Sequence, residues 1–306
     1  MDLNLKIAVL IPCFNEELTI GKVIDDFRKV LPNADIYVFD NNSTDDTVAI
    51  STKHNAIVKE EFRQGKGNVV RSMFKFVDAD VYIMVDGDDT YPVDCIDQLL
   101  QPVIEGYADM VVGDRHSAGF YQAENKRNLH GFGNNLVKTL INFLFRSDLK
   151  DIMSGLRVFN KEFVKLISIN SDGFEVETEM TLHALDKKYR IIEVPISYKD
   201  RPEGSYSKLN TISDGIRVIK TIFWVFKDYK PLYFFGVMSL FFFFLSMVIG
   251  TPVVVEFVQT GYINKVPSAI LSTGLMLISV LSLFSAFILD AMVKQHRESY
   301  DILSKK

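Results

Sequence analysis

The C-terminal third of the chain holds two long apolar runs that contain no charged residue. The first covers residues 231–255 and the second residues 266–289, so they are 25 and 24 residues long. A helix of about 20 residues crosses the roughly 30 Å hydrocarbon core of a bilayer. Two buried core helices are the alternative, but core helices of this length seldom lack every charge. We therefore predict transmembrane helices at 231–255 and 266–290, joined by a short non-cytoplasmic loop at 256–265.

Basic residues flank the two runs on their outer sides. Four precede the first run and four follow the second: Arg217, Lys220, Lys227, Lys230, Lys294, Arg297, Lys305 and Lys306. Such an excess marks the cytoplasmic side of a membrane helix. The N-terminal segment lacks the basic start and the cleavage site of a signal peptide. We predict an integral protein of the inner or plasma membrane, with the N-terminal part, the tail at 291–306 and both termini in the cytoplasm.

Residues 211–230, just before the first run, have the pattern of an amphipathic helix. Apolar residues recur there at helical spacing: Ile212, Ile216, Ile219, Phe223 and Phe226. Such a helix packs against the preceding domain or lies in the membrane plane. Trp224 and the neighbouring lysines favour the second position, at the level of the lipid headgroups.

Residues 1–210 alternate short apolar runs with helical stretches. Strands are expected at 6–12, 35–40, 56–60, 81–86 and 109–114. Helices are expected at about 16–31, 65–79 and 93–105, and a further helix follows the second strand and ends at about residue 54. Ser43 or Thr44 is expected to cap the second helix. This order predicts an α/β domain, a mostly parallel sheet with helices on both faces.

The charge, the cysteine count and the absence of two motifs argue against several classes of protein. The net charge is -5, and nothing in the sequence suggests the basic face that binding to nucleic acid needs. The two cysteines, Cys13 and Cys95, are too few for a disulfide framework and are expected to be small buried residues. The sequence has neither the GxGxxG of a dinucleotide fold nor the GxxxxGK[ST] of a P-loop.

Polar clusters follow the strands at the end where parallel sheets bind ligands. The stretch VYIMVDGDDTYP ends a strand with three acids, Asp86, Asp88 and Asp89. Asp86 and Asp88 suit Mg²⁺ or Mn²⁺, which take oxygen ligands and share them with phosphates. A solvated turn is the alternative. Asp89, with Thr90, is expected to cap the helix after Pro92.

Other polar residues at this edge fit a nucleotide and phosphates. Asp40 ends the second strand and could bind a base or ribose, or cap the next helix. Gly65 and Gly67 would let the backbone approach a phosphate. Basic residues follow along the chain, each of which could also be a solvated surface charge: Arg115, Arg127, Arg157, Arg201 and Lys208.

These motifs together resemble those of one family. IPCFNEE, VFDNNSTDDT, GKGN, VDGDDTYP, GDR, SGLRVF and RPEGSYSK occur in the order seen in family 2 glycosyltransferases of the polyprenyl-phosphate type. That group includes dolichol-phosphate mannose synthases and bacterial bactoprenol glucosyltransferases. The resemblance covers residues 6 to about 210, and the two spans match the bacterial branch. It implies a glycosyltransferase-A fold, similar to a Rossmann fold, with residues 1–210 as the cytoplasmic catalytic domain.

The resemblance also assigns roles to individual residues. A nucleotide sugar would contact Pro12, Phe14, Glu16, Val38, Asp40, Asp86, Gly87 and Arg115. A divalent ion would bind Asp86 and Asp88, with Thr90 a weaker candidate because the mannose synthases commonly have Gln there. The lipid phosphate would be bound by Arg115, Arg127, Arg201 and Lys208, although the spacing from Arg201 to Lys208 is one residue longer than in the mannose synthases. The QxxRW of processive synthases is absent.

The implied reaction is an inverting, metal-dependent transfer of a hexose to undecaprenyl phosphate at the cytoplasmic membrane face. Glucose from UDP-glucose is the favoured donor, with GDP-mannose or a UDP-aminosugar as alternatives. A sugar nucleotidyltransferase and a non-catalytic membrane scaffold are the rival classes. Asp151, Glu177 and Glu179 could each be a base, an orienting group or a structural residue. Small residues in the spans could pack on each other or between subunits of a homo-oligomer.

Overall fold

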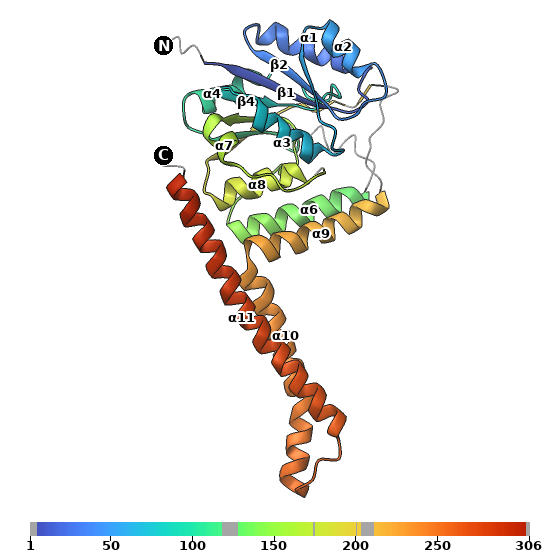
Figure 1. Ribbon diagram of the computed structural model, residues 1–306, viewed down its shortest axis with the longest axis vertical. Helices are drawn as coiled ribbons and strands as arrows, with labels where there is room; N and C mark the ends of the chain where they lie inside the picture. Colours follow the sequence, from blue (N-terminus) through green and yellow to red (C-terminus); the bar gives the residue numbers. More distant parts are fainter. Residues whose placement is uncertain (1–4, 118–127, 174, 200, 203–210, 304–306) are drawn as a thin grey trace. The chain divides into compact units, whose positions relative to one another are not determined.

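The computed structural model describes residues 5–117, 128–173, 175–199, 201–202 and 211–303. The chain divides into two compact units, residues 1–216 and 217–306. In the first unit, the strands and helices alternate along the chain (Figure 1). The strands are β1 (Ile7–Cys13), β2 (Asp35–Asp40), β3 (Ile57–Glu60), β4 (Val81–Met84), β5 (Met110–Asp114), β6 (Arg157–Asn160) and β7 (Ile191–Pro195). The helices of this unit are α1 (Ile20–Val30), α2 (Thr47–Lys53), α3 (Lys66–Phe76), α4 (Ile96–Ile104), α6 (Asn128–Phe145), α7 (Lys161–Leu166) and α8 (Val176–Asp186). The next helix, α9 (Thr211–Tyr229), begins in the first unit and continues into the second.

The strands form one seven-stranded sheet in the order β3-β2-β1-β4-β6-β5-β7. All pairs are parallel except those of β6, which runs against both β4 and β5. The predicted mostly parallel sheet is therefore confirmed. The strands β6 and β7 were not expected from the sequence.

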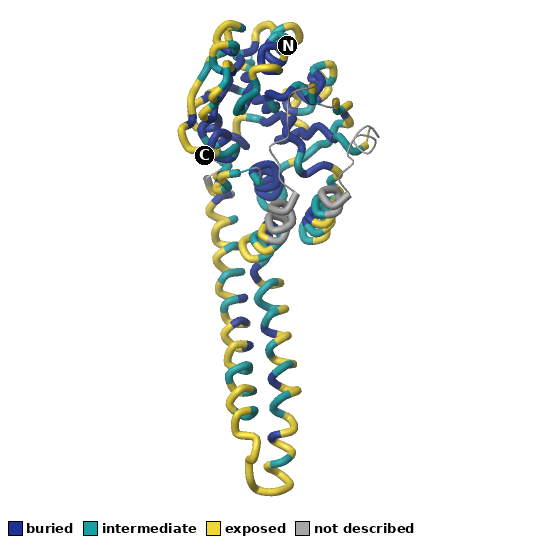
Figure 2. The backbone as a smooth tube through the Cα atoms, turned by 90° about the vertical axis from the view of Figure 1, so that its right-hand side faces the viewer, coloured by how far each residue is buried: buried dark blue, intermediate teal, exposed yellow. Residues whose placement is uncertain are grey.

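Helices cover both faces of the sheet, because successive side chains of each strand point to opposite sides. On one face, α1 and α4 pack on residues such as Val9, Ile11 and Ile83. On the other face, α3, α7 and α8 pack on residues such as Leu10 and Met84. Figure 2 shows these strands as buried. Cys13 is a buried member of the first core, as expected.

Two expected helix caps are wrong. The helix α2 begins at Thr47, and its N-cap residue Asp46 makes no side-chain cap. Ser43 Oγ instead accepts a hydrogen bond from the Asn15 backbone N–H at 2.9 Å, which joins the loops after β1 and β2. Asp89 caps nothing either, because α4 begins only at Ile96. Its carboxylate pairs with Lys22 at 2.6 Å, and its φ of 58° lies in the left-handed region.

The second unit contains the helices α10 (Pro231–Thr260) and α11 (Val266–Leu303). Within the described residues, these are the two helices long and apolar enough to cross a membrane. They pack on each other through serines: Ser279 Oγ donates to Ser239 O, and Ser246 Oγ donates to Ser272 O, both at 2.8 Å. Most of their large apolar side chains are exposed, including Phe241 and Phe244 at 61% each (Figure 2). An apolar surface of this extent fits contact with lipid.

Candidate active site

The strands β1, β2, β4 and β5 end at one edge of the sheet, because they all run in the same direction. The sequence after each strand is polar, so several acidic residues reach this edge together. They are Asp40 after β2, Asp86 and Asp88 after β4, and Asp114 at the end of β5. This is the edge where open α/β sheets bind their ligands.

Asp40 has one carboxylate oxygen without a hydrogen-bond partner in the described structure. The residue is 4% exposed, and its Oδ2 accepts a hydrogen bond from Ser43 N at 3.0 Å. Its Oδ1 is buried and has no partner among the described residues. A buried acceptor left unsatisfied costs about 1–3 kcal/mol, which an N–H or O–H of a ligand would recover. The predicted base or ribose contact fits this oxygen.

The other predicted nucleotide contacts lie nearby on β1 and β2. Pro12 and Phe14 are half-buried at the end of β1, and Glu16 follows in the loop, where its N–H donates to Thr47 Oγ1 at 2.8 Å. Val38 is completely buried in the core, so only its backbone could face a ligand. These four contacts stay predictions.

Asp86 is held by a buried lysine that the sequence did not single out. Lys66 Nζ lies 2.5 Å from Asp86 Oδ1 and 2.5 Å from Glu177 Oε1. Burial alone would lower the pKa of Lys66, but the two carboxylates outweigh it and raise that pKa. Lys66 therefore stays charged and orients Asp86. Glu177 shares this lysine with Asp86, and its role as a base, an orienting group or a structural residue stays a prediction.

The glycines beside Lys66 have a structural use. Gly65 has a φ of 125°, and a Cβ on Gly65 or Gly67 would collide with the backbone of Ser171 and Asp172. Gly67 N donates to Asp172 O at 3.0 Å. The close approach that these glycines allow in the structure is to the backbone of residues 171–172, and the expected approach of their backbone to a phosphate stays a prediction. Glu179 fixes the same turn by accepting from Ser171 N at 2.9 Å.

Asp88 is 3% exposed and has partners on both oxygens. Thr90 Oγ1 donates to its Oδ1 at 2.6 Å, and Arg201 Nη2 lies 2.6 Å from its Oδ2. Burial, and then the charge of Asp86, raise the pKa of Asp88, whereas Arg201 opposes them. The hydroxyl of Thr90 thus serves to orient Asp88.

The helix α1 fixes the loop that carries these acids. Thr19 Oγ1 donates to Gly87 O at 2.6 Å, and Lys22 holds Asp89. Gly87 leaves no room for a side chain, since a Cβ there would lie 2.8 Å from Cys13 Sγ. Two side-chain contacts from α1 thus hold the loop in place.

The residues at this edge fit a divalent ion of the hard class. Within the described ranges, no group of three or more His, Cys, Asp or Glu side chains is arranged to hold a metal. Mg²⁺ and Mn²⁺ sites that use substrate phosphates need only one or two carboxylates. Asp88 already has a cationic group on Oδ2, so the site attracts positive charge. Asp86 and Asp88 would hold the ion.

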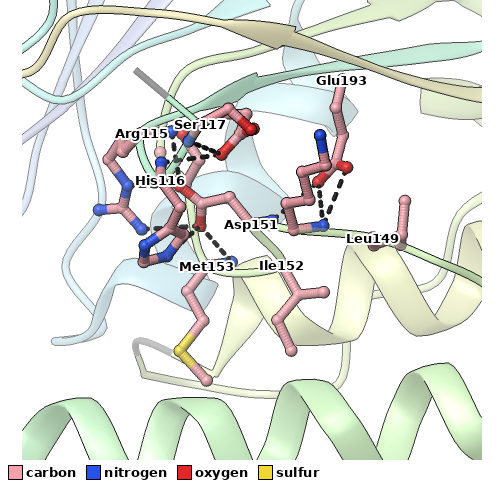
Figure 3. A network of polar contacts seen from close by, with 12 residues as sticks. Arg115, His116, Ser117, Leu149, Asp151, Ile152, Met153 and Glu193 are labelled. Atoms are coloured by element: carbon pink, nitrogen blue, oxygen red, sulfur yellow. Dashed lines mark hydrogen bonds and ion pairs between the residues drawn. The ribbon is translucent and has the colours of Figure 1, made fainter. Parts of the chain in front are cut away.

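Asp151 pairs with Arg115 in a two-bonded arrangement (Figure 3). Arg115 Nε and Nη2 lie 2.7 and 2.9 Å from the two oxygens of Asp151, which is 2% exposed. Burial alone would raise the pKa of Asp151, but Arg115 outweighs it and lowers that pKa. Glu193 holds the preceding backbone, because it accepts from Lys150 N and Asp151 N (Figure 3). This geometry fits the orienting role among those predicted for Asp151, and that role stays a prediction.

Arg157 is buried in the sheet, whereas its charge predicted a residue on the surface or on a phosphate. It is 0% exposed in β6, so the expectation of a phosphate-binding or solvated charge is wrong. Its guanidinium donates to Ser154 O, Ile152 O and Thr181 Oγ1 at 2.8–2.9 Å. Burial lowers its pKa to about 10, so it stays charged at neutral pH. Arg157 shapes the loop that carries Asp151. The remaining predicted site residues, Arg127 and Lys208, lie outside the described residues.

Comparison with known proteins finds glycosyltransferases among the similar sequences. The sequence model described as Glycosyl transferase family 2 matches residues 8–167. The chain is 31% identical to "Glycosyltransferase AglJ" of Haloferax volcanii over 95% of both chains. It is 31% identical to a "Dolichyl-phosphate hexose transferase" of the same organism, over 71% of this chain and 92% of that one. It is 28% identical to the "Dolichol-phosphate mannosyltransferase" of Pyrococcus furiosus, over 70% of this chain and 63% of that one.

Solved structures share the fold of the first unit. Glucosyl-3-phosphoglycerate synthase from Mycobacterium tuberculosis has a TM-score of 0.58 and 20% identity, over 73% of this chain and 80% of that one. The same enzyme in complex with Mn²⁺, UDP and glucosyl-3-phosphoglycerate has a TM-score of 0.53 and 22% identity, over 65% and 73%. At such identities the likeness concerns the fold alone.

Proposed function

The chain belongs to glycosyl transferase family 2, and from this premise we propose that it transfers a hexose from a nucleoside diphosphate to a polyprenyl phosphate. The observation that carries the proposal is the placement of Asp86 and Asp88. Both lie at the ligand-binding edge of the sheet, in a chain that also has two helices of membrane-spanning length. The named hexose transferases among its relatives support the lipid-phosphate acceptor. Glucose from UDP-glucose and undecaprenyl phosphate are the favoured substrates.

The proposed chemistry is mostly positioning and charge stabilisation. A Mg²⁺ or Mn²⁺ ion between Asp86 and Asp88 would neutralise the charge that builds on the departing diphosphate. Asp40 would bind the base or ribose, and Arg115, oriented by Asp151, would bind a phosphate. A phosphate monoester has a second pKa near 6, so the acceptor is largely anionic at neutral pH. It attacks the anomeric carbon from the face opposite the diphosphate, which inverts the configuration, and no strong base is required.

The same proposal covers the placement in the cell. Residues 1–210 would form the cytoplasmic catalytic domain, and the amphipathic α9 would lie at the membrane surface. The helices α10 and α11 would cross the membrane with both termini in the cytoplasm. The serine pairs between these helices use part of the small-residue surface. A Cβ built on Gly236 or Gly274 meets no described atom within 4 Å, which leaves a place for a second subunit.

A donor screen tests the proposal. The full chain in detergent is incubated with undecaprenyl phosphate and radiolabelled UDP-glucose, GDP-mannose or a UDP-aminosugar, with and without EDTA. We expect one donor to label the lipid and EDTA to abolish the labelling, because the diphosphate needs its metal. Release of inorganic diphosphate in the same assay would indicate a nucleotidyltransferase instead. Failure to bind any nucleoside diphosphate by calorimetry would indicate a non-catalytic scaffold.

The role of Asp151 gives a second prediction. We expect Asp151→Asn to lower the transfer rate about tenfold, since Arg115 keeps one acceptor but loses its ionic partner. The measurement is the pH dependence of kcat/KM for wild type and variant. An orienting role leaves the shape of the profile unchanged. A loss of about 10⁴-fold together with the disappearance of the acidic limb would instead identify Asp151 as a general base.

A further inference from the structure

Arg201 forms an ion pair with one of the two carboxylate oxygens of Asp88. Arg201 Nη2 lies 2.6 Å from Asp88 Oδ2, and Thr90 takes Oδ1. The Asp88 side chain is 4% exposed, whereas that of Arg201 is 29% exposed. A divalent ion that binds Asp88 through Oδ2 therefore competes with Arg201 for this oxygen.

Lys66 pairs with Asp86 and Arg201 pairs with Asp88, and these two cations differ in how deeply they are buried. Lys66 is 11% exposed, and its departure would leave two carboxylates, Asp86 and Glu177, without their common partner. Arg201 is the more exposed cation, and the backbone before it is anchored separately, because Lys199 N donates to Thr90 O at 3.0 Å. Of the two cations, Arg201 is thus the one that an arriving divalent ion displaces more readily from its carboxylate.

We propose that Arg201 is the counter-ion of Asp88 until a divalent ion arrives, and that the arriving ion releases its guanidinium to bind substrate phosphate. The inference rests on the proposed function for its metal and its phosphates. An ion of charge +2 neutralises the acid pair better than one guanidinium and then repels that guanidinium. The diphosphate and the acceptor phosphate offer the displaced guanidinium new, two-bonded partners. Metal binding therefore precedes the full use of Arg201 on phosphate.

The first test measures the affinity for Mn²⁺ alone, by electron paramagnetic resonance of free Mn²⁺ with the full chain in detergent. We expect Arg201→Gln to tighten Mn²⁺ binding about tenfold, because the ion no longer competes with an ion pair of ordinary strength. Arg201→Lys should fall between this variant and wild type. Lys199→Gln removes the same charge from an exposed residue two positions away and should change the affinity less than twofold. Unchanged or weaker Mn²⁺ binding by Arg201→Gln overturns the proposal.

The second test follows Arg201 itself. Phenylglyoxal modifies accessible guanidinium groups, and peptide mass mapping reports the rate at position 201. We expect Mn²⁺ to speed this modification several-fold in wild type. In Asp88→Asn the modification should be fast without Mn²⁺ and insensitive to it. A rate that Mn²⁺ leaves unchanged or lowers in wild type contradicts the release of Arg201.

These outcomes are separable from those of the proposed function. If wild type exchanges Arg201 for Mn²⁺ but labels no lipid in the donor screen, the proposed transfer fails and the exchange stands. If it labels lipid but Arg201 fails both tests, the exchange fails and the transfer stands. Wild type that binds no Mn²⁺ through Asp88 overturns the exchange and the metal part of the proposed function together.

Discussion

Asp88→Asn is expected to lower kcat/KM for sugar transfer by about 10³-fold. Asn has the size of Asp but lacks the charge, so the divalent ion that stabilises the departing diphosphate loses its best-placed ligand. The measurement is the steady-state rate with the donor found in the screen, at saturating Mn²⁺. Asn still accepts the hydrogen bond that Thr90 Oγ1 donates to Asp88, but it loses the ion pair with Arg201, so thermal unfolding of the variant is measured alongside the rate.

Asp89→Asn is the matched control for this variant. Asp89 is the adjacent acid of the same loop, and it pairs with Lys22 on the side of α1. Its φ of 58° suits Asn, which tolerates the left-handed region. We expect a change in activity of less than about threefold, since an exposed pair contributes roughly 0–1 kcal/mol. An Asp88→Asn protein that keeps a tenth or more of wild-type activity would disprove the metal role of Asp88.

Lys66→Met is expected to lower the free energy of unfolding by about 3–5 kcal/mol, because it leaves Asp86 and the buried Glu177 without their shared cation. For a unit of about 200 residues this corresponds to a fall of roughly 10 °C in the unfolding midpoint. The measurement is thermal unfolding of the full chain in detergent. Adding Glu177→Gln to Lys66→Met removes one of the two unpaired charges and should recover about half of the loss.

Lys165→Met provides the comparison for Lys66→Met. Lys165 is 38% exposed and pairs with Asp78 on the surface at 3.4 Å. Its replacement should change the free energy of unfolding by less than about 0.5 kcal/mol. Equal midpoints for Lys66→Met and wild type would show that the buried pair contributes nothing to stability.

The ligand-binding edge could be predicted from sequence because each of its strands is a continuous apolar run. Such runs identify β1, β2 and β4, and the polar residues after them must then share one edge. Asp40, Asp86 and Asp88 follow from this reasoning alone. The strand β6 does not, because it begins with a charged residue, Arg157, whose burial depends on backbone carbonyls that no sequence pattern reveals.

The partners of the site residues could not be predicted for a similar reason. Lys66 and Glu177 are far apart in sequence, and the only local sign of a constrained lysine is its pair of flanking glycines. The same glycines are also typical of a phosphate loop, so the sequence alone does not show that they lie against the backbone of residues 171 and 172. Asp151 and Arg115 likewise meet only through the fold. The sequence therefore predicts which residues carry charge to the edge, and the structure determines which of them neutralise one another.

The reversed direction of β6 has a topological consequence. The chain leaves the sheet after Asp114 and re-enters it at Arg157, and both points lie at the same edge because β5 and β6 are antiparallel neighbours. The base of this excursion is closed, since Gly113 N donates to Leu156 O at 3.0 Å and Arg115 pairs with Asp151. A single reversed strand therefore brings a second segment of the chain, with the Arg115–Asp151 pair at its base, to the edge where the parallel strands end.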